Sequence, residues 1–130
     1  MKKAHFLWVD DEIDLLKPYI LFLEEKGYSV DCANNGNDAL EMCRLSPYDL
    51  IFMDEHMPGL TGLETLSALH TFRPDIPVVM ITKSEDEGIM NKAIGKKIAD
   101  YLIKPVKPNQ ILITIKKLLD QKEIISETAT

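Results

Sequence analysis

The segment at residues 50–54 reads Leu50-Ile51-Phe52-Met53-Asp54, a continuous apolar run that ends at an acid. Strands buried on both faces lack alternation between polar and apolar residues, as in a parallel sheet that helices cover on both sides. Four further runs have this character, although the second is weaker: residues 5–9, 30–33, 78–81 and 101–103. The sequence therefore predicts five strands of a covered parallel sheet.

Amphipathic stretches separate these apolar runs. In the first stretch, Leu16, Ile20 and Leu23 repeat at the spacing of an α-helix. Pro18 falls inside that stretch, and we expect it to bend the helix. Pro108 suits the first turn of the last stretch, where the N–H group that proline lacks has no partner to lose.

Two of the predicted helices begin with a capping box, in which a Ser or Thr and a Glu three residues later bond each other's backbone N–H groups. Thr61 and Glu64 match this pattern, and so do Ser84 and Glu87. Strands and helices thus alternate five times along the chain. Because crossovers between parallel strands are right-handed, this order predicts a doubly wound α/β fold: a five-stranded parallel sheet of flavodoxin-like (βα)5 type, with strand order 2-1-3-4-5.

Length and composition exclude several classes of protein. The 130 residues suit one domain, which we expect at residues 1–119, followed at 120–130 by a tail or the start of a linker to a missing output domain. A net charge of −6 disfavours direct binding of nucleic acid by this domain. No apolar run is long enough to span a membrane, and no signal peptide is evident. Cys32 and Cys43 have neither metal-binding nor redox spacing, which indicates reduced thiols in a cytoplasmic protein.

Charged and hydroxyl residues follow four of the five predicted strands. In the expected strand order, the carboxyl ends of these strands bring Asp10, Asp11, Asp54, Thr82 and Lys104 to one cleft. Three carboxylates repel one another, so we expect Lys104 and a divalent cation to balance them. Oxygen ligands favour Mg²⁺, with Mn²⁺ as a substitute, over Zn²⁺. Asp54 could then act as a nucleophile toward a phosphoryl donor and form an aspartyl phosphate.

These residues lie in sequence strings that resemble the receiver domain of two-component response regulators. The strings are Val9-Asp10-Asp11-Glu12, Asp54-x-x-Met57-Pro58-Gly59-x-x-Gly62, Thr82, and Tyr101-Leu102-Ile103-Lys104-Pro105, and the resemblance covers residues 4–119. It implies that Asp54 accepts a phosphoryl group from a sensor histidine kinase or a phosphotransfer protein. It also implies that Thr82 and Tyr101 are switch residues and that Lys104 contacts the phosphate.

The same resemblance implies the ligands of the metal ion. Asp10, Asp11 and Asp54 would hold Mg²⁺ together with the backbone carbonyl of His56, and the Lys104–Pro105 peptide bond would be cis. One residue departs from the family pattern, because the position after the switch threonine is usually small and here is Lys83. Lys83 could hinder access of the donor or add a second positive charge near the phosphate.

A receiver domain implies a signalling switch that assists its own phosphorylation and dephosphorylation, rather than an enzyme acting on external substrates. Phosphorylation would change the surface formed by the fourth helix, fifth strand and fifth helix, which would contact an output domain or partner protein. Ile113 lies outside the core stripe of the last helix, so that surface could also form a phosphorylation-dependent homodimer. The strings at 7–12 and 81–85 resemble, more narrowly, the N-terminal receiver of Bacteroidetes-type regulators with an alkaline-phosphatase-like output domain.

Two other classes share parts of this pattern. A phosphoaspartyl phosphatase of the haloacid-dehalogenase type also combines Asp, Thr, Lys and Mg²⁺ at strand ends, but it requires an Asp-x-Asp motif on its first strand and a cap domain, and neither is evident. A flavodoxin-like FMN-binding module would share the fold. The acids at residues 10–12 would repel the phosphate of the flavin, which argues against this alternative.

Overall fold

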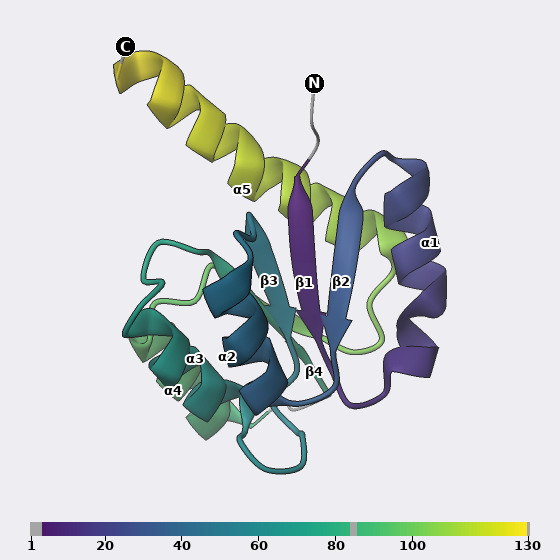
Figure 1. The fold of residues 1–130 in the computed structure, drawn as a ribbon, viewed down its shortest axis with the longest axis vertical. Helices are drawn as coiled ribbons and strands as arrows, with labels where there is room; N and C mark the ends of the chain where they lie inside the picture. The colour runs from purple at the N-terminus through teal and green to yellow at the C-terminus, as the bar shows by residue number, and fades with distance from the viewer. Residues whose placement is uncertain (1–3, 84–85, 130) are drawn as a thin grey trace.

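The fold is known from a computed structural model, which describes residues 4–83 and 86–129, with side chains as far as residue 119. It contains a five-stranded parallel sheet with the order β2-β1-β3-β4-β5, and helices cover both faces (Figure 1). The strands are β1 (His5–Val9), β2 (Ser29–Ala33), β3 (Leu50–Met53), β4 (Val78–Thr82) and β5 (Asp100–Ile103). The predicted fold class and strand order are confirmed, and β2, β4 and β5 are each one residue longer than predicted.

A helical segment follows each strand. The helices are η1 (Ile13–Leu16), a short 3-10 helix that leads into α1 (Lys17–Glu25), then α2 (Gly36–Leu45), α3 (Gly62–His70), α4 (Glu87–Gly95) and α5 (Pro108–Ala129). Helices α1 and α5 pack on one face of the sheet, and α2, α3 and α4 pack on the other (Figure 1). Among the described residues, no helix combines the length and the apolar content that crossing a membrane requires.

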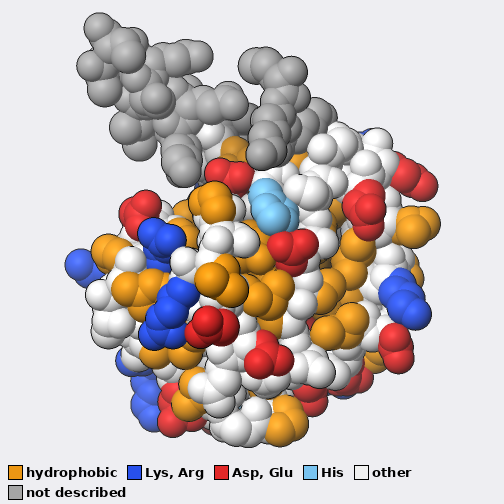
Figure 2. Space-filling view, viewed as in Figure 1, with side chains coloured by type: hydrophobic (Ala, Val, Ile, Leu, Met, Phe, Trp, Pro, Cys, Tyr) orange, Lys and Arg blue, Asp and Glu red, His pale blue; other side chains and the backbone are white. Residues whose placement is uncertain are grey.

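Two apolar layers hold the helices to the sheet. Along β1, Phe6 and Trp8 face α1 and α5, whereas Leu7 and Val9 face the opposite layer. This alternation follows from the period of two residues in a strand. On the face shown in Figure 2, hydrophobic side chains are interspersed with acidic ones, and basic side chains lie mostly on the side of α3 and α4.

The start of α3 confirms one predicted capping box, and the start of α4 contradicts the other. Thr61 accepts a hydrogen bond from the backbone of Glu64 at 3.1 Å, and the Glu64 carboxylate accepts one from the backbone of Thr61 at 2.9 Å. The second predicted box is wrong, because α4 begins at Glu87 and its N-cap is Asp86, whose carboxylate accepts the N–H of Gly88 at 2.7 Å. Ser84 itself lies outside the described residues.

The expected bend at Pro18 is also wrong. Helix α1 begins at Lys17, so Pro18 lies in its first turn, where the backbone N–H groups need no partner within the helix. The preceding residues form the 3-10 helix η1 instead of the start of a longer α-helix. Pro108 is the first residue of α5, as predicted.

Candidate functional site

The register of the sheet brings the first and third strand ends together. Val9 of β1 lies opposite Met53 of β3, so the residues that follow them, Asp10 and Asp54, leave the sheet side by side. The backbone N–H of Asp54 donates to the carbonyl of Val9 at 2.9 Å, which extends the strand pairing to the acid itself. Both carboxylates are buried, with side chains only 1% and 7% exposed.

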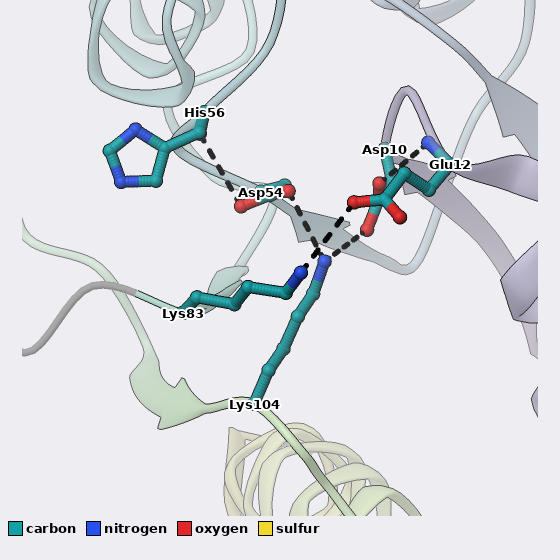
Figure 3. A network of polar contacts seen from close by, with 6 residues as sticks. All are labelled: Asp10, Glu12, Asp54, His56, Lys83 and Lys104. Atoms are coloured by element: carbon teal, nitrogen blue, oxygen red, sulfur yellow. Dashed lines mark hydrogen bonds and ion pairs between the residues drawn. The ribbon is translucent and has the colours of Figure 1, made fainter.

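Lys104 joins the two acids from the end of β5. Its ammonium lies 2.6 Å from Oδ2 of Asp10 and 3.2 Å from Oδ2 of Asp54 (Figure 3). The Lys104 ammonium therefore bridges the carboxylates of Asp10 and Asp54. The Lys104–Pro105 peptide bond is cis, as the resemblance implied.

The electrostatics of the cleft keep Lys104 charged. Burial alone would lower the pKa of Lys104, but the hydrogen bond to Asp10 and the negative charge of Asp54 outweigh burial and raise that pKa above its ordinary value. The pKa of Asp11 is also raised, by partial desolvation first and then by the neighbouring charge of Asp10. The four carboxylates of Asp10, Asp11, Glu12 and Asp54 outnumber the ammonium groups of Lys104 and Lys83, so the cleft retains an excess of negative charge.

Three consecutive acids provide a compact set of oxygen atoms. Asp10, Asp11 and Glu12 each offer a carboxylate oxygen, and these oxygens all lie within 4.8 Å of one another. The second oxygen of Asp10 accepts the backbone N–H of Glu12 at 2.9 Å, which holds this loop against the strand end. Asp54 lies outside this group and is linked to it through Lys104. A donor set made only of carboxylate oxygens fits a hard divalent cation such as Mg²⁺.

Thr82 and His56 lie at the same edge of the sheet, whereas Tyr101 lies within β5, opposite Met80 of β4. Thr82 ends β4, is fully buried, and accepts the backbone N–H of Lys104 through its carbonyl at 2.9 Å. Tyr101 is half-buried and packs against the layer that contains α2, α3 and α4. The backbone N–H of His56 lies 3.4 Å from Oδ1 of Asp54, a long contact for a hydrogen bond, and the His56 side chain is exposed.

Sequence reasoning missed Glu55, which directly follows Asp54. Its carboxylate is buried and accepts the backbone N–H of Leu63 in the first turn of α3 at 2.8 Å, while its carbonyl accepts the N–H of Gly62 at 3.0 Å. Glu55 therefore ties the start of α3 to the residue next to Asp54. An acid in a loop after a strand usually indicates a solvated side chain, so the sequence carried no signal for this role.

A cavity of about 390 Å³ lies beside the carboxylate cleft. Trp8 and Tyr19 line it together with Val106, and Asp10 and Lys104 form part of its polar edge. The hydroxyl of Tyr19 donates to the carbonyl of Val106 at 2.5 Å, which links α1 to the segment after β5. The cavity thus lies between the start of α1 and the β5–α5 loop, next to the site.

Comparison with protein families places the chain in a known class. A model of the response regulator receiver domain matches residues 6–116. The chain therefore belongs to the receiver domain family of two-component response regulators. Proteins of this class act in signal transduction, and neither the phosphatase nor the flavin-binding alternative is favoured.

Individual relatives agree with this assignment. The transcriptional regulatory protein YkoG of Bacillus subtilis (strain 168) is 35% identical over 123 residues, which cover 93% of this chain and 53% of YkoG. ZraR, a transcriptional regulatory protein of Klebsiella oxytoca, is 33% identical over 129 residues, which cover 99% of this chain and 29% of ZraR. The chain therefore spans only part of the length of these regulators.

Solved structures share the fold over nearly the whole chain. A CheY-like response regulator receiver domain protein from Methanospirillum hungatei JF-1 superposes with a TM-score of 0.88 at 28% identity, covering 92% of this chain and 96% of that one. A two-component response regulator from Clostridium difficile gives a TM-score of 0.87 at 27% identity, with 92% and 98% covered.

Proposed function

We propose that Asp54 is the phosphoacceptor of this receiver domain. The observation that carries the proposal is the ammonium of Lys104, which lies within contact distance of both Asp10 and Asp54 in a buried cleft. An aspartate beside a fixed cation at a strand end can attack phosphorus, because the cation offsets the charge on the transferring oxygens.

We propose that Asp10 and Asp11, together with Asp54 and the backbone carbonyl of His56, hold Mg²⁺, with Mn²⁺ as a substitute. The all-oxygen donor set and the excess negative charge of the cleft support this assignment. When bound, the metal would stabilise negative charge on the phosphoryl oxygens. The carboxylate of Asp10 would keep its contact with Lys104, so that both cations remain beside Asp54.

The transfer forms one bond and breaks one. A carboxylate oxygen of Asp54 bonds to phosphorus, and the bond from phosphorus to the donor breaks, so that the leaving group departs with the bonding electrons. The donor is a phosphohistidine of a sensor histidine kinase or phosphotransfer protein, or a small acyl phosphate. In a separate hydrolysis step, a water molecule attacks phosphorus and the bond between phosphorus and the Asp54 oxygen breaks. Inorganic phosphate leaves and Asp54 is again a carboxylate, which resets the switch without turnover of an external substrate.

We propose that the switch reaches the surface formed by α4, β5 and α5. Thr82 and Lys104 would bind the phosphoryl oxygens, and Tyr101 would move toward the space that Thr82 leaves. Ile94 on α4 and Ile113 on α5 are 63% and 66% exposed, which supports a role of this surface in contacting an output domain, a partner protein or a second phosphorylated copy.

The wider context of the domain is also a proposal. The named relatives are transcriptional regulatory proteins, which supports an output domain joined after the receiver at residues 1–119, through residues 120–130. An alkaline-phosphatase-like output domain remains a prediction from the sequence. The free thiols of Cys32 and Cys43 fit a cytoplasmic location. The net charge of −6 supports a receiver that does not itself bind nucleic acid.

Incubation with acetyl phosphate and Mg²⁺, followed by intact mass measurement, tests the assignment. We expect the wild-type chain to gain one phosphoryl group, and Asp54→Asn to gain none, because an amide is a poor nucleophile. Asp75→Asn is a matched control, since Asp75 is exposed and lies away from the cleft. Addition of EDTA should prevent the gain in wild type. A mass gain in Asp54→Asn equal to that of wild type would contradict the proposal.

A further inference from the structure

A second lysine reaches the edge of the carboxylate cleft. Lys83 directly follows Thr82 at the end of β4, and its ammonium lies 3.9 Å from a carboxylate oxygen of Glu12. Glu12 belongs to the loop after β1, next to Asp10 and Asp11. The Lys83–Glu12 pair therefore connects the two loops on either side of the cleft (Figure 3).

Lys83 and Lys104 line the same cavity, together with Asp10 and Glu12. Figure 3 shows both lysine side chains extending toward the carboxylates of Asp10, Glu12 and Asp54. Two ammonium groups are thus directed to one group of acids. The two lysines differ in how strongly they interact with these acids.

Lys104 is fixed, whereas Lys83 can move. The Lys104 side chain is 19% exposed and contacts two buried carboxylates at 2.6 and 3.2 Å. The Lys83 and Glu12 side chains are 72% and 44% exposed, and 3.9 Å is too long for a hydrogen bond. Solvent screens such a pair, so little free energy is lost when Lys83 exchanges Glu12 for a stronger anion.

We propose that Lys83 is a second phosphoryl-binding cation, which Glu12 holds at the mouth of the cleft until a phosphoryl group is present. The inference rests on the proposed phosphorylation of Asp54. As the bond between phosphorus and the donor breaks and the bond to Asp54 forms, Lys83 leaves Glu12 and donates N–H groups to the non-bridging oxygens. Lys83 keeps its proton and forms no covalent bond, so its contribution is electrostatic.

The charge and the size of the Lys83 side chain would have opposite effects on the rate of phosphorylation. If the Lys83 side chain only obstructs the cleft, a neutral residue of similar length should not slow phosphorylation. If its charge assists the transfer, the same substitution should slow it. Lys83→Met keeps the length of the side chain without the charge, and Lys83→Arg keeps the charge.

The test measures the rate of phosphorylation by acetyl phosphate at saturating Mg²⁺ and low salt, with intact mass as the readout. We expect Lys83→Met to react about fivefold more slowly than wild type, and Lys83→Arg to recover most of the rate. Lys117→Met, which alters an exposed lysine of α5, is the control for loss of one positive charge. Lys83→Met should also bind beryllofluoride, a phosphoryl analogue, about fivefold more weakly.

A double-mutant cycle tests the role of Glu12. Glu12→Gln should accelerate phosphorylation about twofold in the wild-type background, because Lys83 is released, and should have no effect in the Lys83→Met background. An equal effect of Glu12→Gln in both backgrounds would show that Glu12 does not act through Lys83 and would overturn the holding role.

Two outcomes separate this inference from the proposed function. If wild type gains a phosphoryl group and folded Lys83→Met reacts at least as fast, only the role of Lys83 is overturned. If wild type gains none under conditions in which it binds Mg²⁺, the phosphoacceptor proposal fails and the role of Lys83 fails with it. Equal urea midpoints for wild type and Lys83→Met would exclude misfolding as the cause of a slower rate.

Discussion

Lys104 and Asp10 are 94 residues apart in the chain, and the ammonium of one lies 2.6 Å from Oδ2 of the other. This contact joins the ends of β1 and β5, which are separated in the sheet by β3 and β4. Because Asp54 shares the same ammonium, Lys104 compensates two buried carboxylates at once. The positive charge that compensates these two buried carboxylates therefore comes from a side chain of the protein.

Replacement of Lys104 by Met should destabilise the chain when metal is absent. Two buried carboxylates would lose the ammonium that they share, and we expect the free energy of unfolding in EDTA to fall by about 2–4 kcal/mol. Mg²⁺ should bind Lys104→Met more tightly than wild type, because the repulsion between the metal ion and the neighbouring ammonium is removed. Urea unfolding measures the first effect, and Trp8 fluorescence measures the second, since Trp8 lines the same cavity as Asp10 and Lys104.

Lys117→Met serves as the control for this substitution, because it removes a charge from an exposed site on α5. Its urea midpoint and Mg²⁺ affinity should remain close to those of wild type. Equal unfolding free energies for Lys104→Met and Lys117→Met in EDTA would contradict the structural account of the cleft.

Gly62 allows α3 to approach the end of β3 at Asp54. A Cβ atom at this position would lie 2.3 Å from the carbonyl oxygen of Asp54 and 2.9 Å from Cα of Glu55, and both are backbone atoms that cannot rotate away. We expect Gly62→Ala to lower the free energy of unfolding by about 1–3 kcal/mol and to slow phosphorylation, because Asp54 must shift. Urea unfolding and the acetyl phosphate assay measure both effects.

Gly95 provides the matched control, since a Cβ there would meet no heavy atom within 4 Å. Gly95→Ala should leave stability unchanged or raise it by about 0.5–1 kcal/mol, because alanine reduces the freedom of the unfolded chain. If Gly62→Ala were as stable as Gly95→Ala, the close approach at Asp54 would be wrong.

The stability of the fold should fall at alkaline pH, in part because of Cys43. Burial raises the pKa of the Cys43 thiol to about 11 from 9.0, although the charge of Arg73 opposes this effect. As the pH rises, the unfolded chain therefore loses this proton first, so the stabilisation is complete below about pH 9 and is lost as the pH passes about 11.

Comparison of wild type with Cys43→Ala isolates this effect. Between pH 8 and about pH 10.5, wild type should lose about 2 kcal/mol more unfolding free energy than the variant, measured by urea denaturation under reducing conditions. The pKa of Cys32 is also raised, but Cys32 is present in both proteins, so its contribution cancels in the comparison. Parallel pH profiles would show that Cys43 is not protected from ionisation.

The sequence predicted the sheet well because its strands are buried on both faces. In residues 50–53, for example, the run without polar interruption corresponds to β3, with all four residues buried. The acids and Lys104 could be assigned to one cleft because the strand order determines which strand ends are neighbours. The sequence could also locate the start of α3, where Thr61 and Glu64 form a complete local motif.

Two kinds of feature were not predicted: a helix start at which two local caps compete, and contacts that depend on tertiary structure. Ser84 and Glu87 match the same motif as Thr61 and Glu64, but Asp86 lies between them and caps α4 instead. The role of Glu55 depends on the distance between two backbone segments, which no local pattern encodes. The contact of Lys83 with Glu12 depends on the relative position of two loops, although the sequence already marked Lys83 as unusual.

Association through the α4-β5-α5 surface gives the last prediction. Ile113 on α5 is 66% exposed, and burial of this side chain between two copies would favour a dimer once phosphorylation changes the surface. We expect beryllofluoride and Mg²⁺ to raise the sedimentation coefficient of wild type, and Ile113→Glu to prevent the increase, because a carboxylate would be buried without a partner.

Leu45→Glu is the control, since Leu45 is 76% exposed but lies on α2, away from this surface. If the activated wild-type chain dimerises and Ile113→Glu dimerises equally well while Leu45→Glu does not, the dimer forms through α2 instead. If wild type stays monomeric in saturating beryllofluoride, the predicted homodimer is wrong.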